Sequence, residues 1–333
     1  MGPKIGAMPL DSESGNDHRH SGKSMNQLRG LKTAALAALA AGIVAATAVA
    51  QQPIPPEWAS VETGLGRKGT MQPGRVIKFS FPRSDLSVTA AGVHLKPALA
   101  LGGWVAFKEM PNGQATAMGD LVLTEDEVDP VMKTLQAGGI EQTALHNHLL
   151  RESPRVMYMH VLAHGDASKI ARTIHDALAS SRTPLAPPSP ASAGAPAIDL
   201  DTTTIARTLG VTGKVNGGVY QVSVPRRETI RENGMEVPPS MGVATAINFQ
   251  PTGGGKAAIT GDFVLRANEV NPVIRALRAN GIEVTAIHSH MLDEEPRLFF
   301  MHFWANDDAV KLARGLRTAL DQTAMAAIAV IPQ

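Results

Sequence analysis

One histidine pattern occurs twice in this sequence, 142 residues apart. Segments 143–160 and 285–302 read TALHNHLLRESPRVMYMH and TAIHSHMLDEEPRLFFMH, and both fit His-x-His-x3-Glu-x-Pro-Arg-x4-His. Histidines at i and i+2 of a strand point to the same face, and the glutamate and third histidine follow closely enough to converge on one point. The pattern therefore predicts a metal site in each copy. The predicted ligands are His146, His148, His160 and Glu152, and His288, His290, His302 and Glu294.

Three neutral imidazoles and one carboxylate form a ligand set that suits zinc first, and also manganese, iron, nickel or copper. Glu152 and Glu294 are alternatively general bases beside the metal. The competing interpretation is that these histidines are hydrogen-bonded structural groups of a packed sheet. The retention of all four residues in both copies, while neighbours such as Asn147 and Ser289 differ, favours the metal site.

Other charged residues lie near the pattern. Arg155 and Arg297 are candidates to bind a carboxylate or phosphate of a substrate, or else they pair with the adjacent glutamate. Acidic residues also precede or begin the helix expected upstream, and they are interpreted as turn residues and helix N-terminal charges rather than as catalytic groups. These acidic residues are Asp120, Asp262, Glu127 and Glu269.

The histidine pattern belongs to a larger internal duplication. Segments 119–160 and 261–302 are identical at 23 of 42 positions without a gap, which indicates a duplicated domain. A Pro/Ala/Ser-rich stretch lies between the copies and is typical of a solvated tether. The expected organisation is repeat 1 over 56–180, a linker over 181–198, repeat 2 over 199–322 and a tail over 323–333.

Each copy predicts the same α+β fold, with a mostly antiparallel sheet and two helices. The apolar spacing in 127–135 predicts a helix, and Asp166 is a plausible N-cap of a second helix that extends to about residue 178. Segments 140–150 and 156–163 are expected to form a hairpin that aligns the histidines. The other expected strands of repeat 1 are 76–81, 104–107 and the short segment 120–123.

The N-terminal 50 residues predict export. Arg29 and Lys32 precede an apolar run that ends in Ala48-Val49-Ala50, so residues 25–50 have the form of a cleavable signal peptide. Residues 1–24 are interpreted as a non-native or disordered extension. The apolar run is too short and too rich in alanine to favour a stable membrane span. The expected location of the mature chain is periplasmic or secreted.

Composition narrows the range of partners. The chain has 31 basic and 30 acidic residues, a net charge of +1, and therefore no strong field that would attract nucleic acid. It has no cysteine, which excludes disulfides and thiolate ligands. The expected partner is a small-molecule ligand or substrate, and the two repeats are expected to pack on each other.

The duplicated block, especially GDFVLRANEVNPVIRALRANGIEVTAIHSHMLDEEPRLFFMHFWA over 261–305, resembles the LppY/LpqO family of exported bacterial proteins. That resemblance implies secretion and a duplicated domain of unknown function. His146-x-His148-x3-Glu152 is also similar to the first cupin motif, although helices between the strands disfavour a jelly roll. His146-x-His148-x11-His160 is similar to the zinc triad of acetolactate decarboxylase and related zinc ester hydrolases.

The leading hypothesis is an exported metal-binding protein with a His-x-His/Glu/His site in each repeat, and the enzyme class that this site would suit is a zinc-dependent hydrolase or lyase. One alternative is a non-enzymatic module that binds a metal or a small ligand. A third is a structural protein of the cell envelope with buried histidines.

Overall fold

The computed structural model describes residues 53–111, 114–186 and 197–325. The expected N-terminal extension and signal peptide lie outside the described residues, as do most of the expected linker and of the tail. Among the described residues, no helix is both long and apolar enough to cross a membrane.

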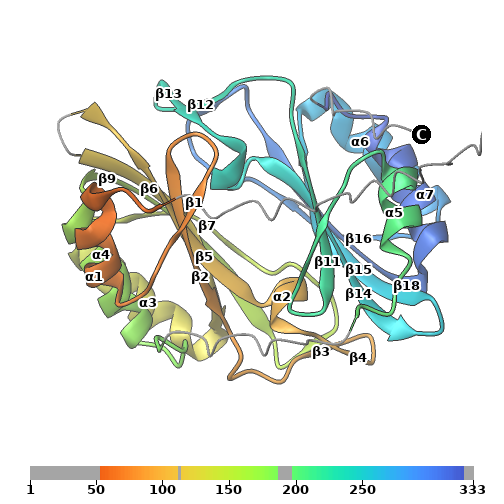
Figure 1. The fold of residues 1–333 in the computed structure, drawn as a ribbon, viewed down its shortest axis with the longest axis horizontal. Helices are drawn as coiled ribbons and strands as arrows, with labels where there is room; N and C mark the ends of the chain where they lie inside the picture. Colours follow the sequence, from red (N-terminus) through yellow and green to blue (C-terminus); the bar gives the residue numbers. More distant parts are fainter. Residues whose placement is uncertain (1–52, 112–113, 187–196, 326–333) are drawn as a thin grey trace, which may run out of the picture. The chain divides into compact units, whose positions relative to one another are not determined.

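Repeat 1 is built on a six-stranded antiparallel sheet (Figure 1). Its strands, in spatial order, are β1 (Thr70–Gln72), β2 (Val76–Pro82), β5 (Gly102–Glu109), β6 (Gln114–Thr124), β9 (Val156–Asp166) and β7 (Glu141–His146). One face is covered by α1 (Ala59–Leu65), α3 (Glu125–Ala137) and α4 (Ala167–Ala179). The apolar core of the repeat lies between that face and these helices.

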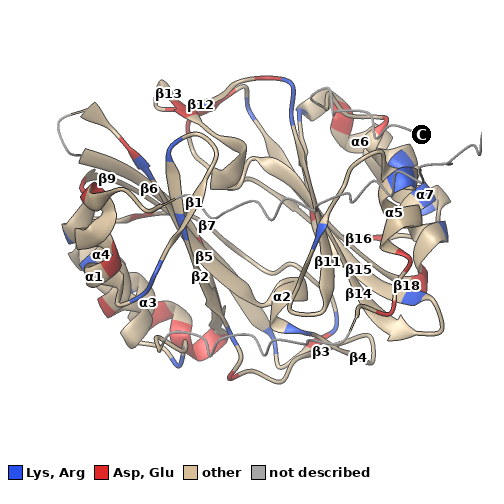
Figure 2. Cartoon of the chain, in the orientation of Figure 1, with Lys and Arg blue, Asp and Glu red and all other residues tan. Residues whose placement is uncertain are grey.

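Repeat 2 has the same architecture, which confirms the α+β fold and the duplication. Its sheet runs β10 (Lys214–Asn216), β11 (Val219–Pro225), β14 (Ala244–Gly253), β15 (Lys256–Leu265), β18 (Phe299–Asp308) and β16 (Glu283–His288). The covering helices are α5 (Thr202–Leu209), α6 (Ala267–Ala279) and α7 (Ala309–Leu320). Acidic and basic residues are interspersed over both repeats (Figure 2).

Two details differ from expectation. The strand expected over 120–123 extends over the whole of β6, because β5 and β9 hydrogen-bond to it on both sides although its first half is rich in Ala, Gly and Thr. Each repeat also begins with a helix that the sequence did not predict. These helices, α1 and α5, are short and rich in β-branched residues, and they are stabilised by packing of apolar side chains on the core.

The second face of each sheet packs against the other repeat. Two apolar clusters combine side chains from both repeats, for example Leu162 with Phe300 and Tyr158 with Trp304. Each repeat also extends an arm across its neighbour. One arm is β3 (Thr89–Ala90), β4 (Val93–His94) and α2 (Pro97–Ala100), and the other is β12 (Ile230–Glu232), β13 (Met235–Val237) and the 3-10 helix η3 (Pro239–Met241).

Hydrogen bonds hold both arms in place. The side-chain amide of Gln250 in repeat 2 forms two hydrogen bonds with the first arm. Its oxygen accepts from Lys96 N at 2.8 Å, and its nitrogen donates to His94 O at 2.8 Å. On the opposite side, Lys78 Nζ donates to Ser240 O of η3 at 3.3 Å. Each arm therefore bonds to the other repeat, and together the two arms help to hold the inner faces of the two sheets against each other.

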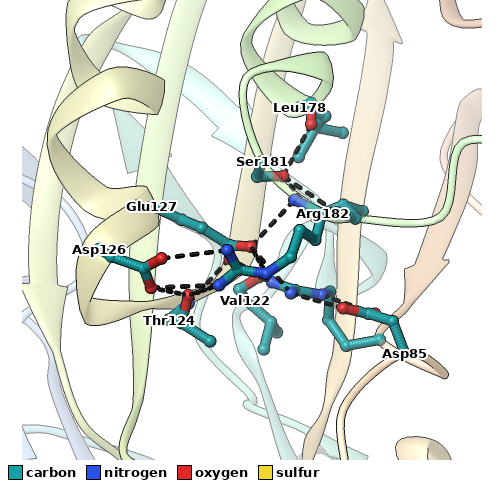
Figure 3. A network of polar contacts seen from close by, with 10 residues as sticks. Asp85, Val122, Thr124, Asp126, Glu127, Leu178, Ser181 and Arg182 are labelled. Atoms are coloured by element: carbon teal, nitrogen blue, oxygen red, sulfur yellow. Dashed lines mark hydrogen bonds and ion pairs between the residues drawn. The ribbon is translucent and has the colours of Figure 1, made fainter.

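A buried ion pair fixes helix α3 to its sheet. The guanidinium of Arg83 is fully buried and donates to Glu127 Oε2 at 2.7 Å and to Val122 O at 2.7 Å. Glu127 also accepts from the backbone nitrogens of Thr124 and Arg182, each at 2.9 Å, and so closes a capping box at the helix start (Figure 3). Glu269 pairs with Arg226 in the same way in repeat 2. The two glutamates therefore have the helix N-terminal role that the sequence indicated.

We expect Glu127→Ala to lower the free energy of unfolding by about 3 kcal/mol, because it removes the more deeply buried of the two carboxylates that pair with Arg83 and the acceptor of two backbone nitrogens. Urea denaturation followed by circular dichroism measures this change. The matched control is Asp129→Ala, which removes an exposed pair with Lys133 on the same helix and should have a much smaller effect. Equal effects of the two substitutions would contradict the structural role of the buried pair.

Candidate metal centre

The structure brings all six patterned histidines into one cluster between the repeats. His146 stacks on His288 with 3.6 Å between ring centroids. The ring centroid of His148 lies 3.8 Å from that of His302, and the ring centroid of His160 lies 3.7 Å from that of His290. Each of these pairs joins one residue of each repeat. Two separate centres were expected, whereas the inner faces of the two sheets here form a single composite centre.

The hairpin that carries the histidines differs in one respect from expectation. His146 is the last residue of β7, so the strand ends before His148, which lies in the following loop. The chain leaves the sheet there because Glu152 and Ser153 form a short strand, β8 (Glu152–Ser153), that pairs with β3 of the arm. His160 lies within β9 opposite Ala144 of β7. Repeat 2 places its three histidines at the corresponding positions.

Hydrogen bonds between the repeats position both loops. Thr143 Oγ1 donates to the carbonyl oxygen of His290 at 2.6 Å, and Thr285 Oγ1 donates to that of His148 at 2.6 Å. The two bonds are equivalent, because Thr285 and His290 are the repeat-2 counterparts of Thr143 and His148. Each repeat therefore orients the second histidine of the other.

Most of the imidazole nitrogens in the cluster lack a hydrogen-bond partner. His302 Nδ1 lies 2.8 Å from the carbonyl oxygen of Gly261 and donates to it, which leaves the lone pair on Nε2. The Nε2 atom of each of the six histidines is buried and has no protein hydrogen bond. A carbonyl that fixes one ring nitrogen so that the other can bind a metal is typical of histidine ligands.

Two aspartates belong to the cluster, and the sequence interpretation of them as turn residues is wrong. Asp120 and Asp262 lie within the central strands β6 and β15, directly opposite His160 and His302. Asp120 Oδ1 lies 3.8 Å from His160 Nε2, and Asp262 Oδ2 lies 3.8 Å from His290 Nε2. The signal that could have found them is an acidic residue in an otherwise apolar strand in both copies, since such a residue needs a partner when buried.

The donor atoms fall into three groups in which all ligand atoms lie within 4.8 Å of one another. One group joins the repeats and consists of His146, His288 and His302. The other two are His146, His148 and His160, and Asp262, His290 and His302. The last two groups have no residue in common, so the ligand set is large enough for two ions.

Burial sets the protonation of the cluster. Burial, with a smaller contribution from His288, lowers the pKa of His146 to about 3, and burial lowers that of His288 to about 4. Burial raises the pKa of Asp120 to about 7, against a smaller opposing effect of Lys78. It also raises the pKa of Asp262, with a contribution from Asp120. The site therefore favours neutral imidazoles, which is the form that binds a metal.

The two predicted glutamates have different surroundings. Glu294 Oε1 accepts from Leu298 N at 2.9 Å, and its Oε2 accepts from Arg297 at 3.2 Å. Both carboxyl oxygens of Glu152 are buried and form no hydrogen bond of that length, and burial raises its pKa to about 7 against smaller opposing effects of the Val156 backbone nitrogen and of Arg155. Neither glutamate belongs to the three donor groups of the described chain. Arg297 thus forms the expected pair with its glutamate, whereas Arg155 is exposed and lies 3.5 Å from Glu125.

A narrow cavity reaches the cluster from one side. It is lined by His160 and His290 together with Trp104, Met118 and Met241. Met118 and Met241 also line a larger neighbouring cavity of about 200 Å³. The two cavities therefore adjoin.

A family model matches both repeats, over residues 59–180 and 203–322, and its description is Domain of Unknown Function (DUF1259). The chain belongs to this family. The match shows a duplicated domain of unknown function, as the resemblance implied. The LppY/LpqO relationship itself stays a prediction.

Other comparisons add little. No curated protein matches the chain. Among solved structures, a trimeric bacterial microcompartment shell protein PduB is 13% identical, with 74% of this chain and 88% of that chain covered and a TM-score of 0.18. EtuB from Clostridium kluyveri is 10% identical, with 75% and 89% covered and a TM-score of 0.17. Likenesses at these TM-scores carry no argument.

The histidine pKa values predict acid sensitivity of the metal-free chain. In the unfolded chain the six histidines titrate near pH 6.5. Below that value the unfolded state binds more protons than the folded state, so the free energy of unfolding falls as the pH falls toward the lowered native values. Asp120, Asp262 and Glu152 act in the opposite sense, because their contribution to stability is lost as the pH rises through their raised native pKa values. Six groups outweigh three, so the net change in the free energy of unfolding between pH 7 and pH 5 follows the histidines.

We therefore expect the urea midpoint to decrease between pH 7 and pH 5 in the presence of a chelator. The variant His146→Phe/His288→Phe keeps ring volume and removes two of the titrating groups, so its midpoint should change less over the same range. Identical pH slopes in the two proteins would show that these histidines do not titrate as described.

Proposed function

We propose that this chain is an exported metal-binding protein with one centre built jointly by its two repeats. One observation carries the proposal: each of the six histidines and the two aspartates presents a buried nitrogen or oxygen without a hydrogen-bond partner. Such atoms cost about 1–3 kcal/mol each when left unsatisfied. These atoms converge from both repeats, so a cation bound among them would offset that cost.

The chemistry of the donors supports zinc first. Neutral imidazole nitrogens with one or two carboxylates are the usual zinc ligands, and the same set accepts manganese, iron, nickel or copper. The absence of cysteine from the sequence restricts the ligand set to nitrogen, oxygen and thioether sulfur. When bound, the metal would supply positive charge and Lewis acidity at the boundary between the sheets.

The first test is metal content. We expect the purified mature chain to contain at least one divalent metal ion by inductively coupled plasma mass spectrometry. His146→Ala/His302→Ala, which removes a ligand from each of the three donor groups, should lose most of it. The control is His175→Ala, which changes a half-buried histidine of α4 outside the cluster. A wild-type chain free of metal after purification without chelators, or unchanged content in the double variant, would overturn the proposal. Loss of stability with no effect on metal would favour the structural role.

Proton release tests whether the aspartates are ligands. The imidazoles are already neutral at pH 6, whereas Asp120, with a pKa of about 7, is mostly protonated there. Metal binding at pH 6 should therefore release about 1 to 2 protons per chain, from carboxyl groups rather than from histidines. Calorimetry in buffers of different ionisation enthalpy gives this number. Asp120→Asn should release fewer protons, and an unchanged number would exclude Asp120 as a ligand.

A metal-dependent hydrolase or lyase is the second candidate, and the difference between the two glutamates favours it. Glu152 has free carboxyl oxygens and a pKa near neutrality, which suits a general base. Glu294 is held by Arg297 and a backbone nitrogen instead. A screen of ester and 2-oxo-acid substrates distinguishes this role from metal or ligand binding alone. Turnover abolished by Glu152→Gln and kept by Glu294→Gln would support it.

A further inference from the structure

The larger cavity beside the histidine cluster is unusually rich in methionine. It has a volume of about 200 Å³ and lies between β5, β6 and the arm of repeat 2. Four of its lining residues are Met110, Met118, Met235 and Met241. Two of these side chains, Met110 and Met235, are half-buried, in contrast to Met159 and Met301, which are fully buried in the helix-facing cores.

Two of the sulfur atoms and one imidazole meet at a single hydroxyl. Thr116 Oγ1 lies 2.9 Å from Met110 Sδ, 3.3 Å from Met235 Sδ and 3.0 Å from His164 Nδ1. A hydroxyl has one hydrogen and can donate to only one of these three atoms. Three soft or borderline donor atoms are therefore gathered around one hydroxyl, and at least one of the two sulfurs receives no hydrogen bond from Thr116.

We propose that Met110, Met235 and His164 form a second site, for a soft monovalent cation such as Cu(I) or Ag(I). Thioether and imidazole ligands without thiolate or carboxylate select Cu(I) over zinc, calcium or magnesium. Methionine has three rotatable side-chain bonds, so small rotations bring both sulfurs to a common ion. Partial burial lowers the pKa of His164, which keeps its ring in the neutral, ligating form.

The internal duplication shows that this donor set is particular to one half of the molecule. All four positions change chemical type in the copy 142 residues away. The counterparts of Met110, Thr116, His164 and Met235 are Thr252, Ala258, Asn306 and Val93. In that copy Thr252 Oγ1 simply donates to Asn306 Oδ1 at 2.8 Å. The fold therefore does not require this donor set, which occurs only where β6 and β9 of repeat 1 meet the arm of repeat 2.

The proposed soft-cation site shares no ligand with the histidine cluster. It lies beside the route to that cluster, because Met118 and Met241 line both cavities and the inner cavity reaches His160 and His290. The two sites can therefore be tested independently.

The experiment titrates Ag(I), a redox-inert probe of Cu(I) sites, into chain labelled with ¹³C at the methionine methyl groups. The background is His146→Ala/His302→Ala, which removes a ligand from each of the three donor groups of the histidine cluster, so that silver bound there does not interfere. We expect about one equivalent of Ag(I) to shift the methyl signals of Met110 and Met235, which single Met→Leu variants assign. Met110→Leu/Met235→Leu should weaken binding at least about tenfold, as expected on loss of two of three ligands.

Two variants control for folding. Met132→Leu changes a half-buried methionine on α3, outside the cavity, and should leave Ag(I) affinity unchanged. His164→Gln changes an exposed side chain and should weaken binding with little effect on thermal stability. Unshifted methyl signals, or equal affinity in the Met110→Leu/Met235→Leu variant, would overturn the proposal. Silver binding that occurs in the wild-type chain but is lost in the His146→Ala/His302→Ala background would refute the soft-cation site while the histidine centre stands.

Discussion

The contact between the inner faces of the two sheets is the constraint on which the rest of the structure depends. It buries six imidazoles and two carboxyl groups against one another, and burial of unpaired polar groups is unfavourable. Apolar clusters with side chains of both repeats surround the site and offset that penalty. The exchanged arms close the contact at both sides, and the two threonine bonds set the register of the histidine loops. The same burial that opposes folding also keeps the imidazoles neutral and able to bind a metal.

The internal duplication explains why the histidine centre is nearly symmetric, and local differences between the repeats break that symmetry. Each repeat supplies the same three histidines and one aspartate, so their meeting at the interface gives a nearly symmetric ligand set. The departures from symmetry are local. Lys78 lies near Asp120 and lowers its pKa, while the counterpart of this lysine is Gln221. Glu152 is free where Glu294 is paired.

Much of the fold followed from local patterns, and the errors have physical reasons. The two helices that the sequence predicts in repeat 1 depend on nearby residues, so their positions agreed closely with expectation. Helices α1 and α5 were missed because packing on the core, rather than helix propensity, stabilises them. Asp120 was misread because β6 is a central strand whose extent depends on neighbours from distant parts of the chain. His148 was placed on a strand, but β8 pairs with an arm that local sequence cannot indicate.

The sequence by itself determined the duplication, the α+β class and the six histidines, because identity between the copies and spacing along one strand are local properties. Only the tertiary structure decided that these histidines form one centre rather than two, that Asp120 and Asp262 join them, and that Glu152 and Glu294 differ. It also brought Met110, Met235 and His164 together from both repeats. Each of these results depends on the packing of one sheet on another, which joins residues more than 100 positions apart and leaves no periodic pattern in the chain.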